Sequence, residues 1–266
     1  MIKLQFEKDY KNCFAELGLK SFEDIFSYAN GSRIGKNSKR DVTAFTLETT
    51  NGKSDFFMKR FMRPHFKDMF FTACKSGHPC SQGQYEWQCA RFLLDSGIKT
   101  YRPVCFGTES RFGIESRSFF VTEKLTGQCL REFITERWQA MSTEQRELTV
   151  KNIGKFVRKL HHAGANMPDL YVWHLYLESE DVTTCDFAII DLHRMSKCRT
   201  VKTDQVVRNL AALDFSMIEK YFTDEMRYSL VESYLDGSSK KEVQSLYKKI
   251  KQRSNVLRSR RHAPVY

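Results

Sequence analysis

Long apolar runs are missing from this sequence. Among its 266 residues no window of about 18 or more uncharged apolar residues occurs, so no segment has the pattern of a membrane-spanning helix. The first residues carry acids early, at Glu7 and Asp9, and lack the apolar stretch of a signal peptide. These absences predict a cytoplasmic protein.

Paired cysteine motifs are missing as well. The eight cysteines stand at positions 13, 74, 80, 89, 105, 129, 185 and 198, and no two of them form Cys-x-x-Cys. Zinc-ribbon and thioredoxin-like functions therefore have no support. We expect reduced thiols that pack as small apolar side chains.

Acidic residues are too few to balance the basic ones, and the formal net charge is +11. Such a charge favours anionic partners: a nucleic acid, an anionic membrane surface or a phosphorylated glycolipid. No RNA- or DNA-binding motif accompanies the charge, so we expect no nucleic-acid partner. The length allows one large domain or two small lobes around a cleft.

Two aspartates and a histidine stand in a pattern that kinases use. Asp169 follows Pro168 in a turn, His174 lies five residues later, and Asp191 ends a buried-strand run. In kinases the first aspartate orients the acceptor hydroxyl, and two later positions hold magnesium on the nucleotide. The pattern predicts Asp169 as the catalytic residue of an ATP- and Mg²⁺-dependent enzyme, with His174 and Asp191 at the metal. Because imidazole is an unusual magnesium ligand, a hydrogen bond from His174 to a phosphate or to Asp169 is the alternative.

These motifs also carry a family resemblance. Asp169 to His174 matches an Asp-x-x-x-x-His run, and Ile190-Asp191-Leu192-His193-Arg194 matches the segment that replaces Asp-Phe-Gly. In both, the chain resembles the lipopolysaccharide core kinases, which phosphorylate heptose or Kdo. The family usually reads Asn-His-Arg-Asp where this chain reads Asn166-Met167-Pro168-Asp169. The resemblance implies an α+β, protein-kinase-like fold with two lobes: an N-terminal antiparallel sheet lobe with one helix, and a mainly helical C-terminal lobe.

An antiparallel meander is predicted in the N-terminal part. Alternating apolar runs stand at 42–48 and 56–61, and Asn51-Gly52 lies between them. This dipeptide is a strong hairpin signal, because both residues tolerate positive φ.

A basic segment with two glycines, Gly31 and Gly35, precedes the meander at 30–40. In a kinase the corresponding loop covers the nucleotide phosphates. We therefore expect both glycines near the nucleotide, with basic side chains facing the phosphates. The candidates are Lys36, Lys39 and Arg40. The glycines do not spell Gly-x-Gly-x-x-Gly, and a plain surface loop is the alternative.

Lys59 shares a face of its predicted strand with Phe57 and Phe61. An ammonium among apolar side chains needs a partner. Residues 84–96 have helical spacing, and the resemblance includes Glu86 near the start of this helix. We expect Lys59 to pair with Glu86 and to contact the nucleotide phosphates. A lysine that reaches solvent and a solvated helix glutamate are the alternatives.

The predicted lobes meet near residue 125. Residues 118–125 read as a buried strand that leads into a hinge, where Lys124 and its neighbours would offer main-chain groups to adenine. We expect a nucleotide-binding lobe at 1–125, a helical catalytic lobe at 126–238 and a basic tail at 239–266. The tail has the pattern of a basic amphipathic helix that could attach to an anionic leaflet; a solvated, partly frayed tail is the alternative.

The predicted activity is transfer of the γ-phosphate of ATP to a sugar hydroxyl of the lipopolysaccharide inner core, on heptose or Kdo. We expect a phosphotransferase of this kind to work in the cytoplasm, with peripheral contact at the inner face of the membrane as the further expectation. Only a short link follows Asp191, with no Ala-Pro-Glu, which argues against a protein kinase. Another small-molecule kinase of the same fold and a pseudokinase scaffold are the alternatives.

Overall fold

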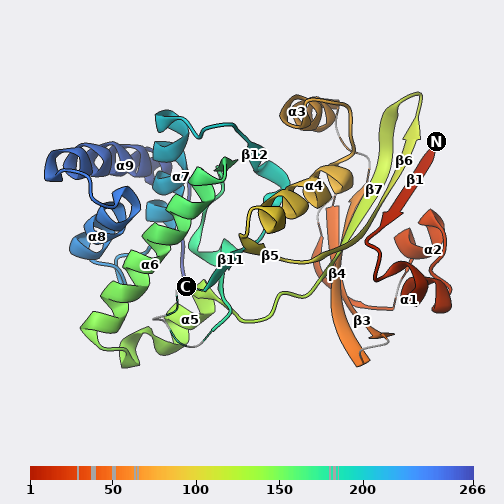
Figure 1. The fold of residues 1–266 in the computed structure, drawn as a ribbon, viewed down its shortest axis with the longest axis horizontal. Helices are drawn as coiled ribbons and strands as arrows, with labels where there is room; N and C mark the ends of the chain where they lie inside the picture. The colour runs from red at the N-terminus through yellow and green to blue at the C-terminus, as the bar shows by residue number, and fades with distance from the viewer. Residues whose placement is uncertain are drawn as a thin grey trace. The chain divides into compact units, whose positions relative to one another are not determined.

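The chain forms two compact units (Figure 1). The computed structural model describes residues 1–28, 30–36, 40–49, 52–62, 64, 66–179, 181, 184 and 186–266, without the side chains of Lys36 and Thr49. Unit 1 comprises Met1–Asp95 and Thr100–Leu125, and unit 2 comprises Ser96–Lys99 and Thr126–Tyr266.

Unit 1 is built on a six-stranded antiparallel sheet in the order β1-β6-β7-β4-β3-β2. The strands are β1 (Ile2–Phe6), β2 (Ser32–Lys36), β3 (Arg40–Thr49), β4 (Gly52–Met62), β6 (Pro103–Arg111) and β7 (Ile114–Glu123). The predicted meander is present as β3 and β4, which pair along their whole length. Asn51 lies outside the described residues, and Gly52 has the expected positive φ, +98°.

An aromatic-rich core lies between the sheet and two short helices, α1 (Lys11–Glu16) and α2 (Phe22–Phe26). Its fully buried members include Phe14, Phe56 and Phe119. The longer helix α4 (Gln82–Asp95) packs on β6 and β7. Gly83 permits this close approach, because a Cβ there would lie 2.4 Å from the carbonyl oxygen of Phe119.

Two expectations for unit 1 are wrong. The segment at 30–40 is not a loop throughout, because Ser32–Lys36 pairs with β3 as strand β2. Gly31 is needed there for packing, since a Cβ would lie 2.5 Å from the carbonyl oxygen of Ala44, whereas Gly35 has open space around it. Lys39 lies outside the described residues. The resemblance implied one helix in this lobe, but the connection after β4 contains the helix α3 (Phe66–Ser76) in addition to α1, α2 and α4.

Unit 2 is mainly helical. Its helices are α5 (Leu130–Arg137), α6 (Thr143–His162), α7 (Thr203–Ser216), α8 (Asp224–Leu235) and α9 (Lys240–Arg260), with the short helices η1 (Trp138–Ala140), η2 (Val172–His174) and η3 (Leu192–Arg194). Ser142 and Gln145 form a capping box at the start of α6. Gly154 lets α6 and α8 touch, because a Cβ there would lie 2.4 Å from the carbonyl oxygen of Leu230.

Short strands connect these helices. Strand β10 (Leu175–Leu177) pairs with β11 (Phe187–Ile189) and with β8 (Gln128–Cys129), while β9 (Ala165–Asn166) pairs with β12 (Ser196–Lys197). The two-residue strand β5 (Lys99–Thr100) lies at the boundary between the units. The pairing of β9 with β12 brings the segments around Asp169 and Asp191 together.

The basic C-terminal segment is an ordered part of unit 2. Val243, Leu246 and Ile250 of α9 are buried, and the helix contacts α7 and α8. Tyr266 at the chain end donates a hydrogen bond from its hydroxyl to the carbonyl oxygen of Ser216, at 2.6 Å. A frayed tail is therefore wrong, and the apolar side of α9 is used within the protein. Throughout the described ranges, no helix combines the length and the apolar character needed to cross a bilayer.

Candidate active site

In unit 1, strand β4 and helix α4 bring Lys59 and Glu86 together. Lys59 Nζ lies 2.7 Å from Glu86 Oε1, and the side chains are 20% and 1% exposed. A glutamate so deeply buried needs its cation, because an uncompensated buried charge is strongly destabilising. The other oxygen, Glu86 Oε2, is buried and has no hydrogen-bond partner in the described part of the chain. Unit 1 therefore holds a half-buried ammonium fixed by a carboxylate that has spare acceptor capacity.

Two amides of the segment expected to face adenine make hydrogen bonds within unit 1. The amide of Glu123 donates to the carbonyl oxygen of Arg102, at 3.0 Å, and the amide of Lys124 donates to that of Asp55, at 2.8 Å. The Lys124 ammonium lies 3.3 Å from Asp55 Oδ2. Both amides are thus used within unit 1 and are not available to a base. Sequence reasoning missed this because the bonds depend on where distant strands end.

In unit 2, the turn that carries Asp169 is held by its neighbours. Gly164 comes before it with φ +83°, where a Cβ would lie 2.1 Å from the carbonyl oxygen of Cys198. Met167 is 1% exposed and packs in the core. Asn209 of α7 clamps the main chain of Met167, accepting from its N–H and donating to its carbonyl oxygen, each at 3.0 Å. The turn therefore keeps its form although Met167 and Pro168 stand where the family usually has His and Arg.

His161 completes this clamp. Its Nδ1 lies 2.9 Å from the Tyr234 hydroxyl, and its Nε2 donates to the Asn209 side-chain oxygen, at 3.0 Å. Burial, with a smaller contribution from His162, lowers the pKa of His161 to about 4. The ring is therefore neutral at pH 7 and serves packing.

The carboxylate of Asp169 meets a single arginine nitrogen. Arg194 Nη1 lies 2.9 Å from Oδ1 and 3.1 Å from Oδ2. The aspartate side chain is 13% exposed and the arginine 51%. Leu192 and Met195, both buried, anchor the backbone on either side of Arg194. Arg194 thus fixes the orientation of the carboxylate while much of the guanidinium stays accessible.

His174 and Asp191 present a pair of acceptors. His174 Nδ1 lies 2.8 Å from the main-chain oxygen of Asp169. A carbonyl oxygen only accepts, so Nδ1 carries a proton, and the tautomer that can bind a cation has its lone pair on Nε2. That Nε2 lies 3.7 Å from Asp191 Oδ2. Two acceptor atoms at this separation fit a shared cation, although the imidazole is less usual for magnesium than an oxygen ligand.

The backbone at Asp191 is specialised. This residue has φ +61° and ψ +62°, in the left-handed region that aspartate tolerates better than most side chains. The imidazole of His193 orients its carboxylate, with Nδ1 2.9 Å from Oδ1. The hydrogen bond from the Ile190 amide to the carbonyl oxygen of His174, at 2.9 Å, holds the two metal-competent residues in register.

The structure therefore places the predicted residues in two clusters. Lys59 pairs with Glu86 in unit 1, and Asp169, His174 and Asp191 gather in unit 2. Gly31 packs against β3 and Lys124 pairs with Asp55, both within unit 1, while Gly35 has open space around it. No roles were predicted from the sequence for His193, Arg194 and Asn209. His193 and Arg194 follow Asp191 within three residues, which is a signal for them, whereas nothing in the sequence marks Asn209.

Comparison with known proteins gives one family. A model of the lipopolysaccharide kinase (Kdo/WaaP) family matches residues 25–234. Lipopolysaccharide core heptose(I) kinase WaaP of Pseudomonas aeruginosa is 28% identical over 157 residues, 56% of this chain, and the chain spans only 59% of that protein. WaaP of Escherichia coli is 25% identical over 262 residues, 95% of this chain and 97% of that protein.

A solved structure also shares the fold. WaaP in complex with acyl carrier protein matches with a TM-score of 0.72 at 20% identity, covering 96% of this chain and 99% of that chain. At this identity the likeness speaks for the fold alone. The predicted α+β, protein-kinase-like fold is confirmed.

Proposed function

Because the chain belongs to the lipopolysaccharide kinase (Kdo/WaaP) family, as its motifs predicted, we propose that it transfers the γ-phosphate of ATP to a sugar hydroxyl of the lipopolysaccharide inner core. The arrangement around Asp169 is the observation that carries the proposal. Arg194 fixes the carboxylate of Asp169, and a hydrogen bond from His174 to the main-chain oxygen of Asp169 links this residue to the acceptor pair of His174 and Asp191. A scaffold protein has no need of this combination.

Each cluster has a distinct part in the proposed transfer. Lys59, held by Glu86, binds the α- and β-phosphates, and Asp191 with His174 holds magnesium. When bound, magnesium neutralises charge on the phosphate oxygens. Asp169 accepts a hydrogen bond from the sugar hydroxyl and aims its oxygen at the γ-phosphorus. The new P–O bond forms as the bond to the β–γ bridging oxygen breaks, and the hydroxyl proton passes toward Asp169. Catalysis then rests on positioning and charge neutralisation.

Heptose is the favoured acceptor sugar, because the similar proteins from both bacteria carry the name heptose(I) kinase. Kdo is the second candidate acceptor, because the description of the family also names Kdo. The solved relative is a complex with acyl carrier protein. We propose such a carrier as a candidate partner, to be tested by co-purification from cells that express both proteins.

The test is phosphate transfer from radiolabelled ATP to purified deep-core lipopolysaccharides, with and without magnesium. One acceptor should end at Kdo and another should carry unphosphorylated heptose. We expect label on the heptose-containing acceptor only, and only with magnesium. Asp169→Asn should retain ATP binding and lose transfer, whereas Asp9→Asn at an exposed position should behave as the wild type. An Asp169→Asn variant that transfers at the wild-type rate would refute the role of Asp169.

A further inference from the structure

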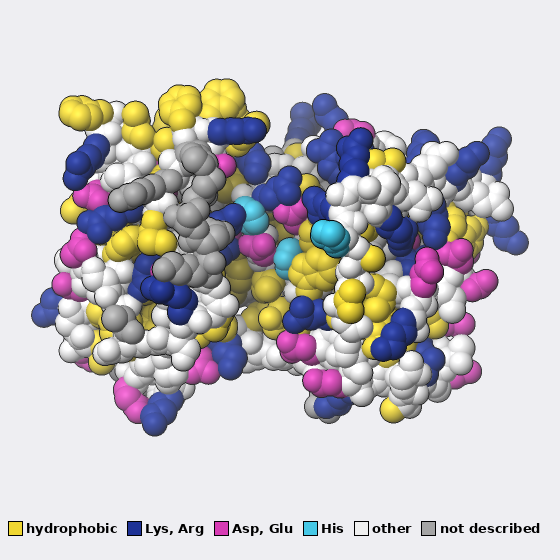
Figure 2. Space-filling view, turned by 180° about the vertical axis from the view of Figure 1, so that it is seen from behind, with side chains coloured by type: hydrophobic (Ala, Val, Ile, Leu, Met, Phe, Trp, Pro, Cys, Tyr) yellow, Lys and Arg dark blue, Asp and Glu magenta, His cyan; other side chains and the backbone are white. Residues whose placement is uncertain are grey.

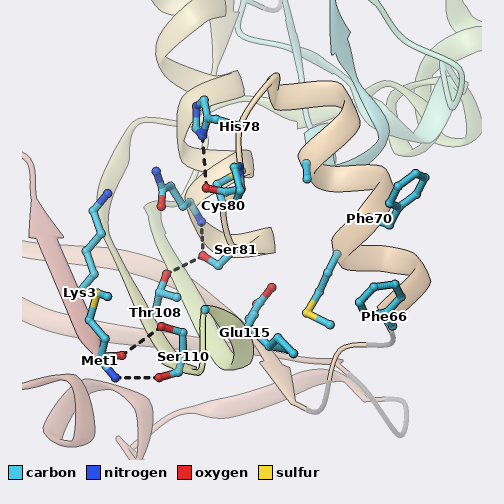
Figure 3. Close-up of a pocket in the computed structure, with 16 residues that line it drawn as sticks. Met1, Lys3, Phe66, Phe70, His78, Cys80, Ser81, Thr108, Ser110 and Glu115 are labelled. Atoms are coloured by element: carbon cyan, nitrogen blue, oxygen red, sulfur yellow. Dashed lines mark hydrogen bonds between the residues drawn. The ribbon is translucent and has the colours of Figure 1, made fainter.

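Exposed apolar side chains gather at one edge of unit 1. Figure 2 shows hydrophobic side chains with Lys and Arg beside them along the edge that carries α3 and the β6–β7 turn. The apolar rim, as we name it, consists of Met1, Phe66, Phe70, Phe71, Phe112 and Ile114, each about half exposed or more. Met1, Phe66, Phe70 and Ile114 surround one open cavity of about 600 Å³ (Figure 3).

Helix α3 leaves its aromatic side chains uncovered. Phe66 is 72% exposed, Phe70 57% and Phe71 49%. Three exposed aromatic rings on one short helix are unusual for a soluble protein. A contiguous exposed apolar patch marks an interaction site. In contrast, α9 buries Val243, Leu246 and Ile250 against the rest of unit 2. Of these two helices, α3 is the one that offers an apolar side to a partner.

Phe112 is the second, independent observation. It forms the two-residue turn between β6 and β7 with Gly113, at φ +51° and +78°. Turns of this kind favour Asn or Gly at the first position, and a bulky residue with positive φ is strained. The Phe112 ring is completely exposed. Local folding therefore does not explain a phenylalanine here, and such an outlier points to a function.

The charges around the apolar rim are mainly positive. Lys3, Lys67 and Arg111 are exposed. Lys67 Nζ lies 5.8 Å from the centre of the Phe71 ring, so cation and ring share one surface. Glu115 is buried in the cavity, where burial raises its pKa to about 7, so that it carries at most part of a negative charge near neutral pH. The half-buried Asp68 is the acid on α3.

We propose that the apolar rim docks unit 1 on an anionic bilayer. Phe66, Phe70 and Phe112 insert at the boundary of headgroups and acyl chains, and Lys67 and Arg111 meet lipid phosphates. This docking replaces the attachment through the basic tail that the sequence suggested. It goes beyond the proposed function, because it needs neither nucleotide nor Asp169.

The experiment is co-sedimentation of the full chain with vesicles, without nucleotide. Vesicles of phosphatidylcholine alone are compared with a 70:30 mixture with phosphatidylglycerol. We expect binding to the anionic vesicles that weakens with salt, and the same binding by Asp169→Asn. Phe66→Ser with Phe70→Ser should lower the partition coefficient about tenfold, and Phe112→Asn about fivefold.

Phe112→Asn also separates docking from folding. Asparagine suits the positive φ, so the melting temperature should be unchanged or raised while binding falls. Phe112→Trp should keep binding, and brominated lipids should quench its added fluorescence. Leu17→Ser, at an exposed apolar residue elsewhere in unit 1, is the matched control and should bind as the wild type.

Three results would overturn the proposal. The first is wild-type partitioning by both phenylalanine variants. The second is loss of binding on Lys248→Ala with Lys249→Ala in α9, which would return the docking to the C-terminal helix. The third is a wild-type chain that does not bind anionic vesicles but binds an acidic carrier protein through the apolar rim. The apolar rim would then be a protein interface.

Discussion

Replacing Arg194 by alanine should damage phosphate transfer far more than it damages the fold. One guanidinium nitrogen contacts both oxygens of Asp169, at 2.9 and 3.1 Å, so its removal lets the carboxylate rotate. Misplacing a catalytic group by about 1 Å costs on the order of 100-fold in rate. We therefore expect kcat to fall about 100-fold, with little change in KM for ATP because Arg194 is assigned no nucleotide contact.

The expected effect on stability is small. Arg194 is 51% exposed, so water screens its charge. A charge-assisted hydrogen bond contributes up to about 3 kcal/mol when buried, but a half-exposed pair contributes about 1 kcal/mol or less. Urea unfolding of Arg194→Ala should therefore show only this modest loss. A purely structural arginine would instead lower stability and activity together.

The assay is the same transfer to heptose-containing acceptor, at saturating ATP. Arg194→Lys should recover part of the lost kcat, and dilute guanidinium chloride should partly rescue the alanine variant. Arg199→Ala, at an exposed arginine five residues further on, is the matched control. Turnover of Arg194→Ala within threefold of the wild type would refute the positioning role, provided that the wild type itself is active.

Three further predictions concern stability and are read by urea unfolding. Glu86→Gln should cost about 2–4 kcal/mol, because Lys59 loses the carboxylate 2.7 Å from its ammonium; an unchanged midpoint would contradict this. Burial raises the pKa of Glu115 from 4.5 to about 7, so its stabilising effect is complete below pH 4.5 and disappears as the pH rises through 7, a change of about 3 kcal/mol. Glu115→Gln should flatten that pH dependence, and a slope equal to that of the wild type would speak against it. Gly154→Ala should destabilise by about 1–3 kcal/mol, since its Cβ would lie 2.4 Å from the Leu230 carbonyl oxygen; a neutral result would show that α6 and α8 can separate.

Local signals in the sequence predicted several elements near where they lie. The alternating runs around Asn51-Gly52 became β3 and β4, and Ser142 with Gln145 started α6. These signals work because hairpin turns and helix caps depend on neighbouring residues. Strand β2 was not predicted, because a segment with Gly31 and Gly35 has the composition of a loop. The reason for Gly31 is its close packing against the carbonyl oxygen of Ala44 on β3, which only the structure shows.

The sequence by itself determined the kinase motif and the identity of its acids, because Asp169, His174 and Asp191 stand at fixed spacings. Only the tertiary structure decided which groups surround them. Arg194 reaches Asp169 because β12 pairs with β9, and Asn209 holds the turn because α7 packs there. The tertiary structure also determined that α9 buries Val243, Leu246 and Ile250, whereas α3 exposes its phenylalanines. The surroundings of the acids and the burial of each helix depend on contacts between segments far apart in the chain. Local sequence patterns depend only on neighbouring residues and therefore cannot predict such contacts.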